Sequence, residues 1–219
     1  MKNNAMPDLD GFRKHLRPEA AFPALASASR REEIEVGGIV VSGSFAAGDF
    51  SGLVFEQVLF EHCRFVDCTF EDSSFERVFF FDSDLSNCRL KRTSFTDSIW
   101  WESKGVGADL AESRWSGSRV IACRLTDANF SHCRLRKTRL EGSDFSNVSF
   151  SRSEFRELQV AESMFVHTDF FQTPLKGIDF CSCRLEGIGL SADAAELRQA
   201  IVTAPQAVEL AKRFGLEIR

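Results

Sequence analysis

Two histidine–cysteine pairs are the residues of this chain best suited to chemistry, because imidazole and thiolate groups are common zinc ligands. They are His62-Cys63 and His132-Cys133, within a total of four histidines and seven cysteines. The chain also carries 32 acidic residues, from which a general acid and base could be drawn. No nucleophile elbow, phosphate-binding loop or metalloprotease motif accompanies them. Whether the pairs can form a site depends on which way each residue faces in the fold.

A five-residue period governs the chain from Phe45 to Leu190. A large apolar residue falls at almost every fifth position, and sixteen of the 22 phenylalanines share this phase. The period fits neither a helix of 3.6 residues per turn nor a flat strand with a repeat of two. It requires a chain that turns a corner every five residues and stacks one large side chain per side in a central column. The column is interrupted at Gly105, which we interpret as a local widening or bulge.

The residue two positions before each large one is usually small, and it should also face inward. Six cysteines take this narrow position: Cys63, Cys68, Cys88, Cys123, Cys133 and Cys183. A free thiol there behaves as a small hydrophobe, although a disulfide between Cys68 and Cys88, in neighbouring coils, is an alternative. The histidine of each pair falls at an outward position, and His62 and His132 lie on opposite sides of the coil. We therefore expect no metal site, no cofactor and no enzymatic activity.

The repeat resembles the pentapeptide-repeat family, whose consensus is a small residue, Asp or Asn, Leu or Phe, and two polar residues. The clearest matches are Gly48-Asp49-Phe50, Ser83-Asp84-Leu85, Ala108-Asp109-Leu110, Ala128-Asn129-Phe130, Ser143-Asp144-Phe145 and Thr168-Asp169-Phe170. The resemblance implies an all-β solenoid, a right-handed quadrilateral β-helix with four pentapeptides per coil. Residues 38–190 would form about seven and a half coils, a rod about 35 Å long at about 4.8 Å per stacked strand.

The two ends of the chain lie outside the repeat. Residues 1–37 form an N-terminal extension that prolines interrupt, in which Asp10 could cap a short helix carrying Phe12 and Leu16. The first strand of the rod is expected at residues 34–41. Residues 191–219 are expected to form a strand–helix–strand cap, with a short strand near residues 200–202.

The C-terminal helix is expected at residues 204–214. The capping-box pair Thr203 and Gln206 would begin this helix, and Gly215 would end it before a last strand at residues 216–218. This tail must cover the open end of the core. It also resembles the module through which several pentapeptide-repeat proteins dimerise. The candidate dimer contacts are Val208, Leu210, Ala211 and Phe214, and simple capping of the coil is the alternative.

Charge is unevenly distributed, although the net charge of −5 is small. Residues 43–84 carry nine acids against two arginines, and residues 114–140 carry seven bases against one acid. The candidate partner-binding acids are Glu56, Glu61, Glu71, Asp72 and Glu76. Residues twenty apart should stack, so two arginine ladders are expected, Arg114 with Arg134 and Arg119 with Arg139. They are either solvated or dock an acidic protein surface; direct nucleic-acid binding is not expected, because no aromatic platform interleaves with them.

Two apolar columns are expected on the outside of the rod. Leu59, Phe79 and Ile99 form one, and Phe81, Trp101 and Ile121 form the other. Together they would make a patch larger than soluble monomers usually expose. Either the N-terminal segment with Phe12, Leu16 and Phe22 folds over the patch, or Phe81 and Trp101 bind a partner.

The family resemblance also suggests a function. Its best-characterised soluble bacterial members protect DNA gyrase and topoisomerase IV from quinolones or peptide toxins, and the proposed mechanism is mimicry of DNA. No apolar run is long enough to span a membrane, so we expect a cytoplasmic, non-catalytic rod of this kind. The acidic coils approach the charge density of DNA, about one charge per 1.7 Å, whereas the arginine belt does not. The alternatives are a scaffold or adaptor that uses the apolar or arginine-rich face, and a targeted effector whose repeat is a carrier.

Overall fold

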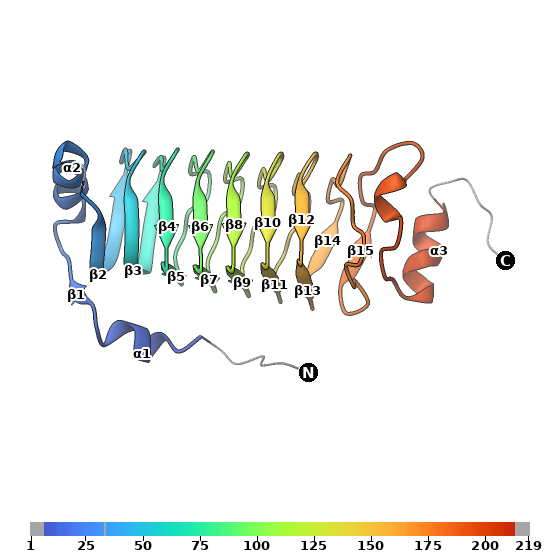
Figure 1. The fold of residues 1–219 in the computed structure, drawn as a ribbon, viewed down its shortest axis with the longest axis horizontal. Coiled ribbons are helices and arrows are strands. Elements are labelled where there is room, and N and C mark those ends of the chain that lie inside the picture. Colours follow the sequence, from blue (N-terminus) through green and yellow to red (C-terminus); the bar gives the residue numbers. More distant parts are fainter. Residues whose placement is uncertain (1–6, 33, 213–219) are drawn as a thin grey trace.

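A computed structural model describes residues 7–32 and 34–212 of the chain as a parallel β-helix of about eight coils (Figure 1). The helices are α1 (Leu9–Arg13), α2 (Phe22–Glu32), the 3₁₀ turn η1 (Ala195–Leu197) and α3 (Ala204–Lys212). The first strands are β1 (Arg17–Pro18), β2 (Val36–Ala46), β3 (Val54–Val66), β4 (Ser74–Glu76), β5 (Phe79–Phe81), β6 (Ser94–Thr96) and β7 (Ile99–Trp101). They are followed by β8 (Arg114–Ser116), β9 (Arg119–Ile121), β10 (Arg134–Arg136), β11 (Arg139–Glu141), β12 (Glu154–Arg156), β13 (Gln159–Ala161), β14 (Met164–Val166) and β15 (Arg184–Glu186).

From β3 onward, strands pair in parallel with the strand twenty residues further on, which confirms four pentapeptides per coil. One ladder, called face A here, runs from the first part of β3 through β4, β6, β8, β10 and β12. The next side of the coil, face B, runs from the later part of β3 through β5, β7, β9, β11 and β13. The other two sides are joined mainly by single bridges such as Arg64↔Asp84 and Asp49↔Thr69.

Both inward positions are filled. The large residues stack directly on their equivalents in the next coil, as in Phe55–Phe75 (ring centroids 4.9 Å apart) and Phe75–Phe95 (4.8 Å). The six inward cysteines are buried and free, so the alternative of a Cys68–Cys88 disulfide is not realised. Inward serines also carry hydrogen bonds: the Ser98 hydroxyl donates to the Phe75 carbonyl (3.0 Å) and accepts from the Val78 amide (3.0 Å). Small polar residues therefore suit the narrow position by size and by satisfying buried backbone groups.

The corners of the coil explain where the histidines lie. The residue two positions after the large one adopts positive φ at corner after corner, including His62 (52°), His132 (58°) and His167 (55°). Asn, Asp and His enter this left-handed region more readily than most residues, and glycine does so most readily. These three histidines are therefore explained by the turns that they make, at outward corner positions of the coil.

The break in the apolar column at Gly105 is not a bulge. The Gly105 amide donates to the Arg124 carbonyl at 2.9 Å, and Lys104 stays in register with Arg124. A Cβ atom at Gly105 would lie 2.7 Å from Leu125 Cδ2 and 3.3 Å from the Trp100 ring. The interpretation of a widening was wrong, because the larger neighbouring side chains fill the space that glycine leaves.

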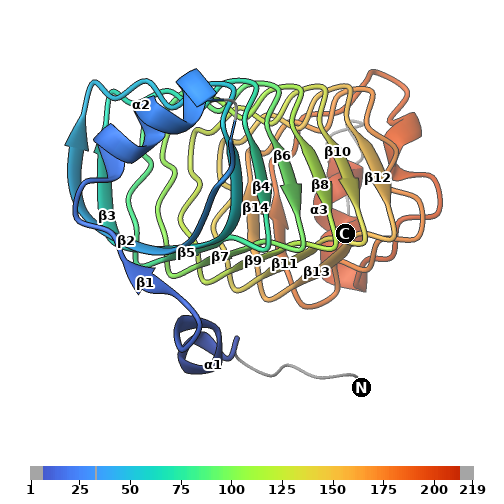
Figure 2. The same cartoon turned by 60° about the vertical axis from the view of Figure 1, so that its left-hand side comes forward.

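The N-terminal segment closes one end of the rod. Asp8, not Asp10, caps α1, by accepting a hydrogen bond from the Gly11 amide (2.8 Å). The sequence does not predict the helix α2, because the prolines of residues 1–37, Pro23 among them, indicate an interruption. Proline is nevertheless tolerated in the first helical turn, where its missing N–H would have no partner. Phe22, at the start of α2, is fully buried against the first aromatic residues of the core, and α2 lies across the end of the coil (Figure 2).

The coils part locally near the other end. Within the described residues, no backbone hydrogen bond joins residues 155–161 to residues 174–181, and the ladders of faces A and B stop at β12 and β13. Pro174 has no N–H to donate at the position where the next strand of face A would begin. Strand pairing is then found again between β14 and β15.

The expected C-terminal elements are present up to residue 212. Ile201 bridges Asp179, and α3 begins at Ala204. The capping box is confirmed, since the Thr203 amide donates to Gln206 Oε1 (2.8 Å) and the Gln206 amide to Thr203 Oγ1 (3.3 Å). Phe214, Gly215 and the expected last strand lie outside the described residues.

Candidate functional site

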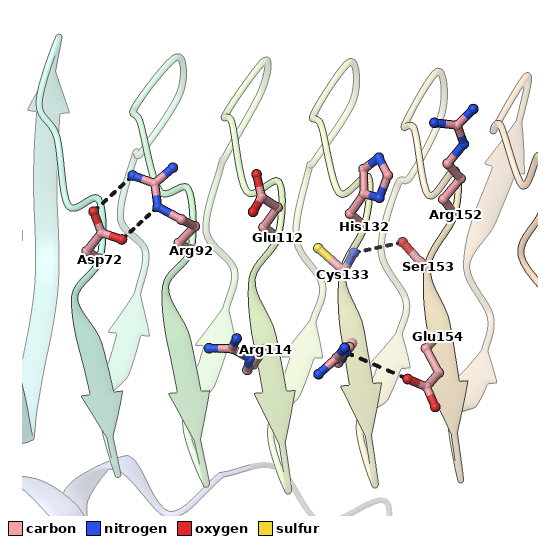
Figure 3. Close-up of a pocket in the computed structure, with 10 residues that line it drawn as sticks. Asp72, Arg92, Glu112, Arg114, His132, Cys133, Arg152, Ser153 and Glu154 are labelled. Carbon is pink, nitrogen blue, oxygen red and sulfur yellow. Dashed lines mark hydrogen bonds and ion pairs between the residues drawn. The ribbon is translucent and has the colours of Figure 1, made fainter.

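A groove of about 620 Å³ along face A gathers more charged side chains than the sequence pattern suggested (Figure 3). Its lining comprises Asp72, Arg92, Glu112, Arg114, His132, Cys133, Arg134, Arg152, Ser153 and Glu154. Residues 72, 92, 112, 132 and 152 stand at the same corner of successive coils, and residues 114, 134 and 154 lie in register on the neighbouring strands. The twenty-residue step brings these side chains together from five coils.

The acids expected to resemble DNA form ion pairs with arginines of the same chain. Arg77 forms ion pairs with both Glu56 and Glu76, and Arg13 of α1 pairs with Glu61. Arg92 holds Asp72 through two hydrogen bonds of 2.7 and 2.9 Å and also contacts Glu71 (3.3 Å).

These ion pairs have an electrostatic consequence. The hydrogen bonds from Arg92 lower the pKa of the Asp72 carboxyl. The carboxylate of Glu35 lies beside that of Glu56, and this neighbour raises the pKa of Glu35. The acidic coils are therefore partly neutralised, and the cluster of Glu35, Glu56 and Glu76 retains three carboxylates around the single guanidinium of Arg77.

Both predicted arginine ladders are present, but they differ in exposure. On face B, Arg119 and Arg139 stack beside Glu141, and Arg139 Nε lies 2.9 Å from a Glu141 carboxylate oxygen. On face A, Arg114 and Arg134 stack in open solvent, with Arg136 two residues beyond Arg134. Within the described residues no carboxylate pairs with Arg114 or Arg136, while Arg134 lies 3.7 Å from Glu154. The face A ladder is thus the one available to another molecule.

The outer apolar columns are in register as predicted, and the N-terminal segment covers one edge of them. Phe12 stacks on Phe79 with ring centroids 4.3 Å apart, and Phe79 is 9 % exposed. Phe81 and Trp101 pack on each other (4.9 Å) and stay partly exposed. Phe22 does not take part in this cover, contrary to one alternative, because it is inserted into the end of the core.

The histidine–cysteine pairs do not form a site. Burial raises the pKa values of the Cys63 and Cys133 thiols to about 12, so both are protonated at neutral pH and are poor ligands and nucleophiles. His62 points outward and bonds Asp82 (2.9 Å). Among the described residues no group of three or more His, Cys, Asp or Glu side chains is placed to hold a metal ion.

The candidate dimer residues of α3 face different surroundings. Leu210 packs against the core, whereas Val208 is 37 % exposed and Ala211 is half-buried. Phe214 lies outside the described residues.

No helix in residues 7–32 or 34–212 is long and apolar enough to cross a membrane.

Sequence reasoning missed Glu112, His132, Arg136, Arg152 and Arg156 as members of the charged face. The signal was available in the same twenty-residue stacking rule that predicted the Arg114–Arg134 ladder. Applying the rule to each outward position would have listed these residues in order. It could not have found which acids Arg77 and Arg13 neutralise, because those contacts depend on side-chain reach.

Comparison with known proteins gives the following matches. The family described as pentapeptide repeats matches residues 106–141 and 123–157. Among solved structures, full-length QnrB1, a plasmid-mediated fluoroquinolone resistance protein, is 18 % identical with a TM-score of 0.40, covering 80 % of this chain and 100 % of that one. HetL from the cyanobacterium Nostoc, a protein involved in heterocyst differentiation regulation, is 13 % identical with a TM-score of 0.44, covering 77 % and 86 %.

A third solved structure is a pentapeptide-repeat protein of the Arabidopsis thaliana thylakoid lumen. It is 19 % identical with a TM-score of 0.33, covering 53 % of this chain and 82 % of that one. No curated protein sequence matches the chain. The family match indicates no catalytic family.

Proposed function

This chain belongs to the pentapeptide-repeat family, and we propose that it is a cytoplasmic, non-catalytic rod that binds another protein through its outer faces. The observation that carries the proposal is the complete filling of the coil. Large side chains and hydrogen-bonded small ones occupy both inward positions of the repeat, as Phe75 and Ser98 do. What remains for recognition is a set of nearly flat strand faces with ordered charges.

The partner that we propose to test first is DNA gyrase or topoisomerase IV, protected from quinolones or peptide toxins. This choice comes from the family resemblance and from the acidic coils at residues 49–84. Mimicry of DNA needs carboxylates that a basic surface can reach, whereas Arg77 and Arg92 now hold four of them: Glu56, Glu71, Asp72 and Glu76. Removing these guanidiniums should make the acidic coils more like DNA.

The experiment is a gyrase supercoiling assay with a quinolone and purified protein. The wild-type chain should restore supercoiling at up to equimolar ratios, and Arg77→Gln with Arg92→Gln should do so at a lower concentration. The control, Arg124→Gln with Arg184→Gln, alters arginines away from the acidic coils. Absence of both rescue and gyrase binding would refute topoisomerase protection; rescue that the Arg77 and Arg92 changes weaken would refute mimicry by these coils.

A second candidate is an adaptor that binds an unrelated protein through face B. The packed pair Phe81 and Trp101 favours it, because both rings stay partly exposed beside the α1 cover. Affinity capture with wild-type and Trp101→Ser protein tests this candidate. One dominant partner retained only by the wild type would support it, and equal retention by both would exclude this face. For α3, dimerisation through Val208 stays a proposal that Val208→Glu tests.

A further inference from the structure

Face A carries an outward row of six residues whose charge order reverses from one end to the other. The row consists of Glu56, Glu76, Thr96, Ser116, Arg136 and Arg156, one from each of six consecutive coils and all in direct register. Two acids are followed by two hydroxyl residues and two bases. We call it the face A row. At about 4.8 Å per coil it extends over about 24 Å.

The neighbouring corner carries a second row with the same kind of symmetry. Asp72, Arg92, Glu112 and His132 stand on four consecutive coils, so that acidic and basic residue types alternate (Figure 3). Its midpoint, between Arg92 and Glu112, is level with the midpoint of the face A row, because Thr96 and Ser116 belong to the same two coils. We call it the corner row. Each row would become electrostatically complementary to a copy of itself turned end for end.

Each end of face A is also short of counter-charge. At one end, the carboxylates of Glu35, Glu56 and Glu76 surround the single guanidinium of Arg77. At the other end, Arg156 and Arg134 share one carboxylate, that of Glu154, which lies 2.5 Å from Arg156 and 3.7 Å from Arg134, and within the described residues no carboxylate pairs with Arg136. Stacked like charges in neighbouring strands repel each other. Counter-charge from another molecule would relieve both ends, and the two ends of a second copy supply it.

We propose that two copies of this chain associate face A to face A with their rods antiparallel. The two-fold axis runs along the strand direction between β6 and β8. It places Glu76 opposite Arg136 and Glu56 opposite Arg156 of the second copy, and each contact occurs twice. In the corner row the same axis places Arg92 opposite Glu112 and Asp72 opposite His132. In the face A row the residues next to the axis, Thr96 and Ser116, are small, and Ser94 leaves room for the exposed side chain of Arg114, which lies opposite it.

One pair of like charges results from this arrangement. Arg77 faces Lys137, but both carboxylates of the face A row already bind Arg77. The contact is small. Five residues at about 3.3 Å each make one side of the coil about 17 Å wide, and the row is about 24 Å long, so the contact covers about 400 Å² per copy. Standard interfaces bury about 800 Å² per partner. The association is therefore expected to be weak, in the micromolar range or above, and to depend strongly on salt.

The test is sedimentation equilibrium of the purified full-length chain at concentrations up to several hundred micromolar. The wild type should dimerise, and raising NaCl from 50 to 500 mM should weaken the dimer at least tenfold. Arg136→Glu with Arg156→Glu makes both ends of the row acidic, and Glu56→Arg with Glu76→Arg makes both ends basic. Each variant alone should lose this association, and an equimolar mixture of the two should regain it as a heterodimer.

The controls separate this interface from other contacts. Arg64→Glu with Arg124→Glu reverses two exposed arginines on a different side of the coil and should leave the dimer unchanged. If the Glu56 and Glu76 variant melts early, Arg136→Gln with Arg156→Gln still tests the interface, because it removes charge without repulsion. A monomer at all concentrations, a dimer indifferent to salt and to reversal, or a mixture that fails to associate would overturn the proposal. The test needs no topoisomerase, so its result is independent of the proposed function.

Discussion

Replacing Phe22 by alanine should remove the side chain that closes the N-terminal end of the core. The Phe22 side chain is fully buried and its ring lies 4.9 Å from that of Phe50, 5.3 Å from Phe45, 5.5 Å from Phe60 and 6.3 Å from Phe55. Truncating a buried phenylalanine to alanine costs about 3–5 kcal/mol, from lost transfer free energy and the cavity left behind. The top of that range applies here, because the surrounding rings are held by strand pairing and cannot collapse into the space.

Phe12→Ala is the matched control from the same segment. Phe12 is half-buried and stacks on Phe79. Such a stack contributes about 1 kcal/mol beyond the area that it buries, so Phe12→Ala should cost clearly less than Phe22→Ala. Each coil contacts only its neighbours, so loss of the Phe22 side chain should loosen the first coils before the rest. The two variants should therefore differ in how much stability they lose and in which coils loosen first.

The assay is urea unfolding followed by circular dichroism, together with amide hydrogen exchange. Phe22→Ala should lower the free energy of unfolding by at least 3 kcal/mol and speed exchange most in β2 and the start of β3. If it costs no more than Phe12→Ala, or if exchange rises uniformly along the rod, Phe22 does not close the core and the reasoning fails.

Two further predictions concern thiols and local opening. In the native chain the thiol reagent DTNB should modify Cys181 alone, because the other six cysteines are buried. The hydrogen bond to Asp179 raises the pKa of Cys181, so the rate of this modification should keep rising with pH beyond the usual range of a thiol. In denaturant all seven cysteines should react. More than one fast thiol in the native chain would contradict the burial. The amide of Glu157, which lacks the bond that the Lys137 amide makes to Arg156 (2.9 Å), should exchange at least tenfold faster than that of Lys137, measured by NMR; equal rates would show that the coils stay paired there.

The coil was predictable because its constraint repeats. Each fifth position from Phe45 meets the same steric condition, so many weak preferences point to one period. From that period follow the twenty-residue register, the burial of cysteines such as Cys123 and the stacking of Arg114 on Arg134. The ends were harder to predict, because each occurs once: α2 was missed at Pro23, and Asp8 rather than Asp10 caps α1.

The sequence by itself determined the solenoid, its inward column and which outward residues share a row, because these depend only on position within a repeat. Only the tertiary structure decided which of those outward charges stay available. Arg13 reaches Glu61 from 48 residues away, Arg77 spans two coils, and Glu141 neutralises one arginine ladder while the other lies open. Such contacts depend on side-chain length and on where the ends of the chain fold back. No repeat period encodes either property.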